Sequence, residues 1–227
     1  MLSKLLISLT IVALLLGAGC IEMDKEVIST VDFSSEARFV NLTRLGSATV
    51  QLEDVNISFG SLSAGEASSY KEFDAGSREL VVTFSEGDGT ADITMSMVFA
   101  TEKKSSVFIL GDTSGTKFIN AIEHYTFDAP PDLNANWTHS DSAIVRVLNG
   151  LPDFEEITVS VVGDNSEFTA DALSYGKASS YNMIFPGDYA ITVAINDSTI
   201  MADTLALLAG ARYTVAIYDE VKGFIDD

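Results

Sequence analysis

Side chains able to do covalent or metal chemistry are scarce in this chain, whose 227 residues contain one cysteine and two histidines. One cysteine excludes an intramolecular disulfide and a cysteine-rich zinc site. A nucleophilic active site needs a serine or cysteine beside a base and an orienting group, yet His124 and His139 both fall in or beside a polar linker. The sequence contains no Gly-x-Ser-x-Gly elbow and no glycine-rich phosphate loop. We therefore expect a protein that is not an enzyme and holds no cofactor.

Acidic residues are the other candidates for chemistry. Residues 112–115 read Asp-Thr-Ser-Gly, and the extra serine breaks the Asp-Thr-Gly turn of aspartic proteases. Asp153, Glu155 and Glu156 share one loop, but calcium takes about six to eight oxygen ligands, and these three lack the dense spacing of a dedicated loop. We expect solvated surface charge here and no metal site.

The single cysteine stands where it has a chemistry of its own. Lys4 precedes an apolar run over residues 5–16, which is shorter than the roughly 20 residues of a membrane-spanning helix and suits a secretory signal. Small residues then lead to Cys20. This order resembles the lipobox of bacterial lipoproteins, with Gly17 where leucine is usual. The alternative is an ordinary cleaved signal peptide in which the cysteine falls by chance.

The lipoprotein resemblance implies a fixed membrane anchor. Residues 1–19 would be removed, a diacylglycerol would be attached to the thiol of Cys20, and residues 20–35 would form a tether. Two acyl chains hold a protein stably on a membrane, since each buried methylene contributes about 0.8 kcal/mol. The protein is then exported and lipid-anchored to the cell envelope. Ile21, where an aspartate often marks inner-membrane retention, favours the outer membrane in a Gram-negative host.

Composition excludes two classes of protein. The net charge is −20, and 47% of the residues are hydrophobic. That apolar content argues against a disordered acidic tail. A phosphate backbone selects a basic face, so the charge argues against a nucleic-acid partner.

The rest of the chain repeats itself once. Residues 62–70 read LSAGEASSY and residues 173–181 read LSYGKASSY, with seven of nine positions identical at an offset of 111. We call these two stretches the repeated segments. Upstream, residues 38–41 match residues 146–149 at an offset of 108. Two copies of about 100 residues are ordinary domain sizes, and the order of matching segments indicates a duplication.

Both copies alternate apolar and polar residues with period two, as half-buried strands do. Glycine-rich turns separate the runs, and the turn at residues 86–89 predicts a hairpin between strands at 80–84 and 91–99. Residues 205–212 are predicted to be a strand end and a turn rather than a helix. The pattern therefore predicts an all-β protein of two tandem immunoglobulin-like antiparallel β-sandwich domains, with about seven strands each.

The predicted boundaries are a first sandwich at 36–127, a linker at 128–141 and a second sandwich at 142–227. The linker contains a proline pair, which stiffens it, and Trp137. Trp137 and the loop residue Tyr175 are candidates for contact with a sugar, and for Trp137 the alternative is a plug between the two domains.

The repeated unit resembles the family called domain of unknown function 4397 (DUF4397). The second copy carries the family's opening strand, its tyrosine, its glycine turn and its closing strand at residues 143–149 (AIVRVLN), Tyr181, 185–189 (FPGDY) and 213–215 (YTV). The first copy carries residues 37–41 (ARFVN), Tyr70 and 74–76 (DAG), but lacks the closing tyrosine and has Ser-Val-Phe at 106–108 there. The resemblance covers residues 36–227. It implies exported, often lipidated, envelope proteins with no assigned activity.

Six residues of these motifs are expected to be structural. The glycines suit a turn with positive φ or a close backbone approach. The tyrosines can bury a ring and send the hydroxyl to a backbone partner. The arginines are expected along a sheet edge, paired with a carboxylate. These residues are Arg38, Tyr70 and Gly76 in the first copy, and Arg146, Tyr181 and Gly187 in the second.

Three functions fit these observations. The first is a membrane-anchored envelope lipoprotein that acts as a non-catalytic structural or protein-interaction module through its exposed sheet edges and loops. The second is a carbohydrate-binding surface module. The third, a remote alternative, is an accessory domain of an exported hydrolase.

Overall fold

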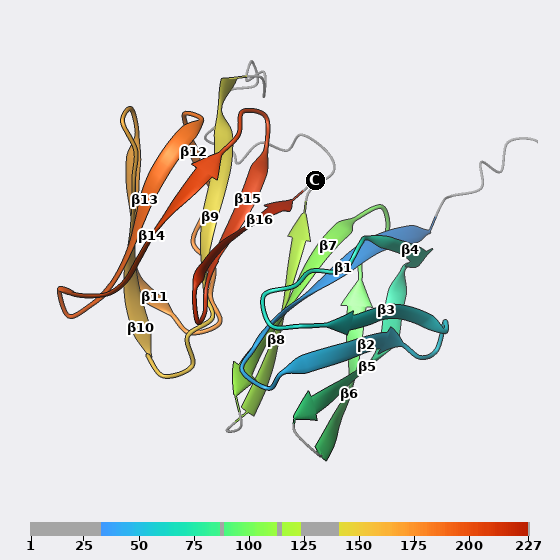
Figure 1. Cartoon of the computed structure of the whole chain (residues 1–227). Helices are drawn as coiled ribbons and strands as arrows, with labels where there is room; N and C mark the ends of the chain where they lie inside the picture. Colours follow the sequence, from blue (N-terminus) through green and yellow to red (C-terminus); the bar gives the residue numbers. More distant parts are fainter. Residues whose placement is uncertain (1–32, 87–88, 113–114, 124–140, 227) are drawn as a thin grey trace, which may run out of the picture. The chain divides into compact units, whose positions relative to one another are not determined.

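The computed structural model of the chain describes residues 33–86, 89–112, 115–123 and 141–226, and is shown in Figure 1. Phe33–Asp227 form one compact unit. The described residues form sixteen β-strands and no α-helix. Accordingly, this part of the chain contains no helix of the length and apolarity that crossing a membrane requires.

The first eight strands form two four-stranded sheets. One sheet has the order β4-β1-β7-β8 and the other the order β3-β2-β5-β6. The strands are β1 (Ser34–Thr43), β2 (Ser47–Leu52), β3 (Ile57–Leu62), β4 (Lys71–Asp74), β5 (Gly76–Glu86), β6 (Gly89–Phe99), β7 (Lys104–Asp112) and β8 (Gly115–Glu123).

The last eight strands form two further sheets with the orders β12-β9-β15-β16 and β11-β10-β13-β14. Every strand of the first half therefore has a counterpart eight strands later, in the same place in its sheet. The strands are β9 (Ala143–Asn149), β10 (Glu156–Val162), β11 (Glu167–Ser174), β12 (Asn182–Ile184), β13 (Gly187–Ile195), β14 (Ser198–Leu207), β15 (Arg212–Ile217) and β16 (Val221–Asp226).

Alternating sequence builds a core within each half. In β2, Ala48, Val50 and Leu52 are fully buried, whereas Thr49 is exposed and Gln51 half-buried. Side chains of successive strand residues point to opposite faces, so one face of the sheet packs inward. Each half has its own apolar cluster, drawn from both of its sheets. The all-β sandwich architecture is confirmed, with eight strands per half rather than seven; the immunoglobulin-like identity stays a prediction.

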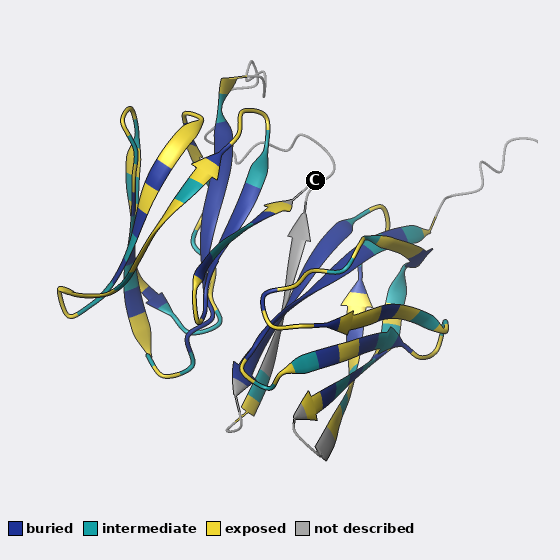
Figure 2. Cartoon of the chain, viewed as in Figure 1, coloured by how far each residue is buried: buried dark blue, intermediate teal, exposed yellow. Residues whose placement is uncertain are grey.

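The central strands β1 and β9 are buried on both faces. All seven residues of β9 are buried, as are the last seven of β1, and Figure 2 shows β9 mainly in the colour of buried residues while β14 is largely exposed. Each is also one member of a parallel pair, β1 with β7 and β9 with β15, inside otherwise antiparallel sheets. Parallel strands are typically covered on both sides, which explains why residues 143–149, apart from Arg146 and Asn149, are apolar without alternation.

The predicted turns lie where the sequence placed them. The hairpin between β5 and β6 is confirmed, as is the strand end and turn between Leu207 and Arg212. Asn196 and Asp197 join β13 to β14 with φ of 47° and 63°. Two-residue hairpin loops favour positive φ, which asparagine and aspartate tolerate.

Candidate functional site

The two repeated segments have the same structural role in the two halves, since each connects one sheet of its half to the other. Each leaves the edge strand β3 or β11 and crosses to the other sheet, where it runs beside β1 or β9. Isolated bridges join Val40 to Ala67 and Leu148 to Ala178. Each segment thus extends the sheet edge that the short strand β4 or β12 occupies further along the same central strand.

In the first half, four backbone contacts secure this crossing. The Gly65 amide donates to the Asn41 carbonyl at 2.6 Å, and the Asn41 amide donates to the Glu66 carbonyl at 2.9 Å. The Ser68 amide donates to the Phe39 carbonyl at 2.8 Å. In return, the Phe39 amide donates to Ser68 Oγ at 2.9 Å. The central strand therefore finds partners on this side beyond the part that pairs with β4, which covers only residues 34–37 of β1.

The second half repeats these contacts at equivalent positions. The Gly176 amide donates to the Asn149 carbonyl at 2.7 Å, and the Asn149 amide donates to the Lys177 carbonyl at 3.0 Å. Ser179 and Val147 exchange the same pair of bonds, with the Val147 amide donating to Ser179 Oγ at 3.0 Å. The identical serine is explained by its Oγ, which accepts from the central strand. The identical glycine is explained by its positive φ, 77° at Gly65 and 75° at Gly176.

Two fully buried asparagines complete the attachment. Asn41 Nδ2 donates to the Leu62 carbonyl at 2.9 Å, and its Oδ1 accepts from the Thr43 amide at 3.0 Å. Asn149 Nδ2 donates to the Leu173 carbonyl at 2.8 Å. A buried amide costs free energy unless it is hydrogen-bonded, so each asparagine fixes where its repeated segment begins.

The arginine predicted at each sheet edge lies instead on the central strand, where it stacks on the tyrosine that ends the repeated segment. The Arg38 guanidinium lies 4.8 Å from the centre of the Tyr70 ring, and its Nε donates to Ser106 Oγ at 2.7 Å. Lys104 Nζ lies 3.9 Å from the same ring. Tyr70 also places its hydroxyl 3.1 Å from Ser106 Oγ.

The second half builds the same cluster from its own residues. Arg146 lies 4.6 Å and Arg212 lies 5.3 Å from the centre of the Tyr181 ring. Arg146 Nε donates to Thr214 Oγ1 at 2.8 Å. Cations over an aromatic face are attracted by its quadrupole. The edge position was wrong because β1 and β9 each have neighbours on both sides.

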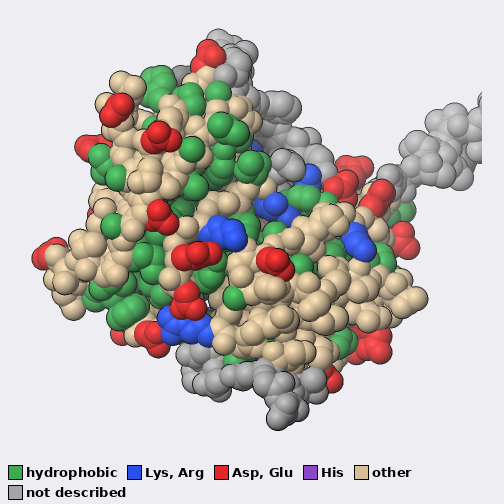
Figure 3. Space-filling view, viewed as in Figure 1, with side chains coloured by type: hydrophobic (Ala, Val, Ile, Leu, Met, Phe, Trp, Pro, Cys, Tyr) green, Lys and Arg blue, Asp and Glu red, His purple; other side chains and the backbone are tan. Residues whose placement is uncertain are grey.

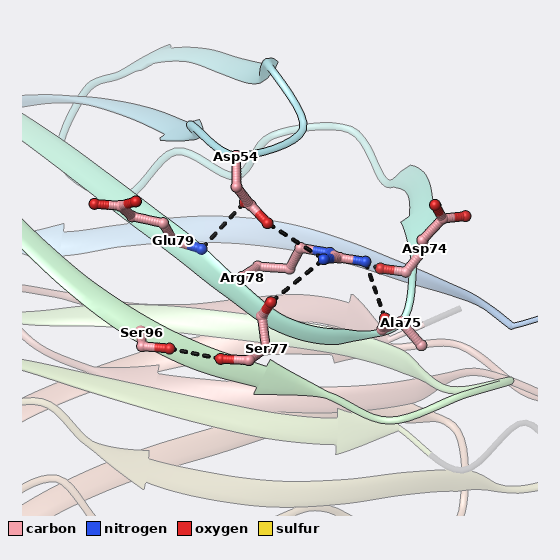
Figure 4. A network of polar contacts seen from close by, with 7 residues as sticks. All are labelled: Asp54, Asp74, Ala75, Ser77, Arg78, Glu79 and Ser96. Atoms are coloured by element: carbon pink, nitrogen blue, oxygen red, sulfur yellow. Dashed lines mark hydrogen bonds and ion pairs between the residues drawn. The ribbon is translucent and has the colours of Figure 1, made fainter.

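The corner before β5 is held by an arginine (Figure 4). Arg78 Nε donates to the Asp74 carbonyl at 2.7 Å, and its Nη2 donates to the Ala75 carbonyl at 2.9 Å. Nη1 pairs with Asp54 at 3.2 Å, which ties in the loop between β2 and β3. Gly76 has a φ of 118° and open space where a Cβ would lie, so the predicted positive φ is confirmed and no close approach is involved.

The equivalent corner before β13 is held by a tyrosine. The Tyr189 hydroxyl donates to the Phe185 carbonyl at 2.6 Å and lies beside Ser166 Oγ, in the loop between β10 and β11. Gly187 again has a positive φ, 150°. Arg78 and Tyr189 are 111 residues apart, the offset of the repeated segments, so they occupy one structural position.

A third apolar cluster contains residues from both halves. Several members come from equivalent positions, such as Val40 with Leu148 and Leu110 with Tyr218. A Cβ at Gly65 would lie 2.2 Å from the Tyr218 hydroxyl, so only glycine fits there. The buried members are Val40, Leu42, Phe108, Leu110, Leu148, Ala216, Tyr218 and Phe224.

Polar groups border this third apolar cluster, which we call the inter-repeat cluster. Arg44 donates to Asp153 at 2.5 Å and to Asp219 at 2.7 Å, and the hydrogen bond to Asp153, followed by that to Asp219, raises the pKa of Arg44. Burial, with a hydrogen bond to Glu220, raises the pKa of Tyr218. Asp153, one of the loop acids considered for calcium, is therefore engaged with an arginine.

The described residues offer little for chemistry. They contain no group of three or more His, Cys, Asp or Glu placed to hold a metal ion. A cavity of about 60 Å³ lies beside Asp164, Phe185 and Tyr189, far below the roughly 300 Å³ of a typical small-molecule site. Figure 3 shows acidic side chains spread over the visible face.

Of the two residues predicted to contact a ligand, the structure describes only Tyr175. Tyr175 is half-buried, packs against the inter-repeat cluster and has a buried hydroxyl, so its ring is not an open platform for a sugar. Trp137, the two histidines and Cys20 lie outside the described residues. The sequence analysis matched Asn41 with Asn149 at an offset of 108 but assigned them no role. That offset was the signal by which the two asparagines could have been found.

A family model matches the second half of the chain. The fold defines an all-β protein with one sandwich topology present twice. Residues 143–226 match the family model described as domain of unknown function DUF4397, which confirms the resemblance for that part of the chain. No curated protein matches.

Two solved structures show distant similarity. The Bacillus anthracis TIE protein is 7% identical with a TM-score of 0.26, over 83% of this chain and 34% of that one. This chain thus spans about a third of that protein. A putative cell adhesion protein from Bacteroides ovatus ATCC 8483 is 9% identical with a TM-score of 0.24, over 86% of this chain and 95% of that one.

Proposed function

We propose that this protein is an exported, lipid-anchored lipoprotein of the cell envelope, and that it acts as a non-catalytic structural or protein-interaction module. The supporting observation is how the polar residues shared by the two halves are used. Asn41, Ser68, Arg38 and their counterparts direct their polar atoms to backbone, hydroxyl or aromatic partners inside the fold. These residues hold loops in place, which supports a structural rather than a catalytic use of them.

The anchor is the part of this proposal that rests on sequence. Cys20 follows a signal-like apolar run, and diacylglycerol on its thiol would fix the module to a membrane surface. A net charge of −20 keeps anionic lipid headgroups away from the folded part, leaving the acyl chains as the attachment. The loops and edges of the sandwiches would then face other proteins of the envelope.

Fatty-acid labelling tests the anchor directly. Cells producing the full chain are labelled with an alkyne palmitate analogue, and the protein is expected to carry the label and to need detergent for release. Cys20→Ser is expected to lose the label, while Ser3→Ala, in the predicted signal, retains it. Release of the unlabelled native protein by a salt wash would overturn the anchoring claim.

A further inference from the structure

Four Asn-x-Ser/Thr triplets occur in the chain, and the structure distinguishes those that it describes. Such a triplet is an acceptor for N-linked glycosylation when it lies in a surface loop of an exported protein. Of the three described triplets, one is buried and two are exposed at turns. The triplets begin at Asn41, Asn56, Asn136 and Asn196, and the one at Asn136 lies outside the described residues.

The triplet at Asn41 is closed to modification. Asn41 is fully buried, and its Nδ2 donates to the carbonyls of Gly46 and Leu62, both at 2.9 Å. The hydroxyl of the triplet belongs to Thr43, which is buried too and donates to Asn41 Oδ1 at 2.8 Å. The nitrogen that would accept a sugar and the hydroxyl that marks it are therefore both engaged inside the fold.

The triplet at Asn56 begins in the turn between β2 and β3. The Asn56 amide donates to the Glu53 carbonyl at 3.1 Å, and its φ of 53° is one that asparagine tolerates. Asn56 and Ser58 are both exposed. Among the described residues, the only side-chain hydrogen bond of Asn56 is at Oδ1, 3.5 Å from Gln51 Nε2, so Nδ2 is available to a transferase.

The triplet at Asn196 lies at the tip of the hairpin between β13 and β14. Ile195 pairs with Ser198, so Asn196 and Asp197 form a two-residue loop. Asn196 and Ser198 are exposed, and no hydrogen bond joins the Asn196 side chain to another described residue. The asparagine and its marking hydroxyl are therefore both open to solvent, which is the reverse of the arrangement at Asn41.

Both exposed triplets lie away from the contact between the two halves. The turns at Asn56 and Asn196 belong to the sheets β3-β2-β5-β6 and β11-β10-β13-β14 (Figure 1). The buried members of the inter-repeat cluster lie instead on the other two sheets or directly after β15. A sugar at either turn therefore leaves that cluster packed, whereas a sugar at Asn41, between Val40 and Leu42, would disrupt it.

We propose that Asn56 and Asn196 each carry an N-linked glycan. The donor is an oligosaccharide held on a lipid phosphate, and the enzyme is an oligosaccharyltransferase of the same membrane. Nδ2 of the asparagine bonds to the anomeric carbon of the sugar, and the bond from that carbon to the phosphate oxygen breaks. The oxygen keeps the electron pair and the lipid phosphate leaves, while Nδ2 loses one proton to a base. The step therefore needs no oxidant or reductant.

This inference rests on the export in the proposed function, and the lipid anchor assists it. An exported chain reaches the side of the membrane where surface glycans are attached. An anchor at Cys20 holds that chain beside a donor that is itself lipid-linked. Two reactants held on one membrane meet at a higher effective concentration than two in solution, so the anchor favours modification of the turns that the fold leaves open.

Mass spectrometry of the full chain, purified in detergent from the cells that naturally produce it, tests the two sites. The peptides that contain Asn56 and Asn196 are each expected to carry the mass of a glycan, and the peptide that contains Asn41 is expected to have its sequence mass. Asn56→Gln and Asn196→Gln are each expected to lower the intact mass by one glycan. The parent peptides decide the question if a variant does not fold.

Substitutions of the hydroxyl test whether the triplet is what the transferase recognises. Ser58→Ala leaves Asn56 in place and is expected to abolish its glycan, while Ser58→Thr, which keeps a hydroxyl, is expected to retain it. Asn165→Gln is the matched control. Asn165 is an exposed turn asparagine with Glu167, rather than a hydroxyl residue, two positions later, so its replacement is expected to leave the glycan mass unchanged.

Three results would overturn the proposal. Sequence mass at both asparagines removes it altogether, sequence mass at one removes it for that residue, and a glycan that persists on Asn56 in Ser58→Ala refutes recognition of the triplet. A chain that takes the palmitate label at Cys20 but carries no glycan contradicts this inference alone. A chain with glycans and no label contradicts the anchor alone, so the two failures are distinguishable.

Discussion

The corners before β5 and β13 solve one problem with two kinds of side chain. At each corner the side chain of the strand's third residue donates to the carbonyl four residues earlier, that of Asp74 or Phe185, and contacts the loop between β2 and β3 or between β10 and β11. Arg78 does this with a guanidinium and an ion pair to Asp54, whereas Tyr189 does it with one hydroxyl beside Ser166. The difference shows that the fold requires a hydrogen-bond donor at this position, whether the donor is charged or neutral. The repeated segments, by contrast, keep nearly every residue.

The largest effect is expected where the two halves agree. Asn41→Ala removes the partners of the Leu62 carbonyl and the Thr43 amide, and Asn149→Ala does the same at Leu173. Buried polar groups left without partners cost about 1–3 kcal/mol each, so each variant is expected to lose roughly 2–4 kcal/mol. Urea unfolding measures this. A loss below about 0.5 kcal/mol in either half would contradict the structural role.

Glycine substitutions separate backbone conformation from contact between the halves. Gly76→Ala places a Cβ in open space and pays only for positive φ, about 1–2 kcal/mol. Gly65→Ala pays that cost and also displaces the Tyr218 hydroxyl. Thermal unfolding is expected to show the larger drop in Tm for Gly65→Ala. Equal drops would mean that Tyr218 does not pack on Gly65.

Alkaline titration tests the environment of Tyr218. Because its pKa is raised in the folded protein, the unfolded chain loses the phenol proton first as pH rises above about 10. Its contribution to stability is full below that pH and declines above it, by up to about 1.4 kcal/mol per pH unit. Tyr218→Phe is expected to flatten the decline in the free energy of unfolding between about pH 10 and 11. An unchanged slope would contradict the burial of this phenol.

The smallest losses of stability are expected at the two corners, and their dependence on salt distinguishes Arg78 from Tyr189. Arg78→Ala and Tyr189→Phe are each expected to cost about 1 kcal/mol. Part of the Arg78 effect is its ion pair with Asp54, which salt screens, while the Tyr189 hydrogen bond is between neutral groups. Chemical unfolding at low and high salt is therefore expected to shrink only the Arg78→Ala difference. A parallel loss in both variants would remove the distinction.

The fold was predictable because local patterns and turn residues agreed with it. Period-two alternation located strands such as β2, and glycine or Asn-Asp pairs located their turns. The parallel pairing of β1 with β7 was not predictable, because strand order depends on contacts far apart in the sequence. Because the strand order was not predicted, Arg38 and Arg146 were expected at a sheet edge.

The repeated segments could be recognised from sequence but not explained. Identity at seven of nine positions marked them, yet the partners of Gly65 and Ser68 lie on β1, more than twenty residues earlier. The equivalence of Arg78 and Tyr189 had a signal in the sequence, the 111-residue offset of the repeated segments. Their common role was not predictable, because a charged residue replaces an aromatic one and only the structure shows that each donates to the carbonyl four residues earlier.

The position of β1 has a mechanical consequence. Among the described residues it is the first strand, and it pairs with β7 over eight residues and with β4 over four. Tension applied at the N-terminal end of the chain pulls along this strand, so many hydrogen bonds are sheared together instead of being opened one at a time. A module tethered from that end would resist being torn from its support.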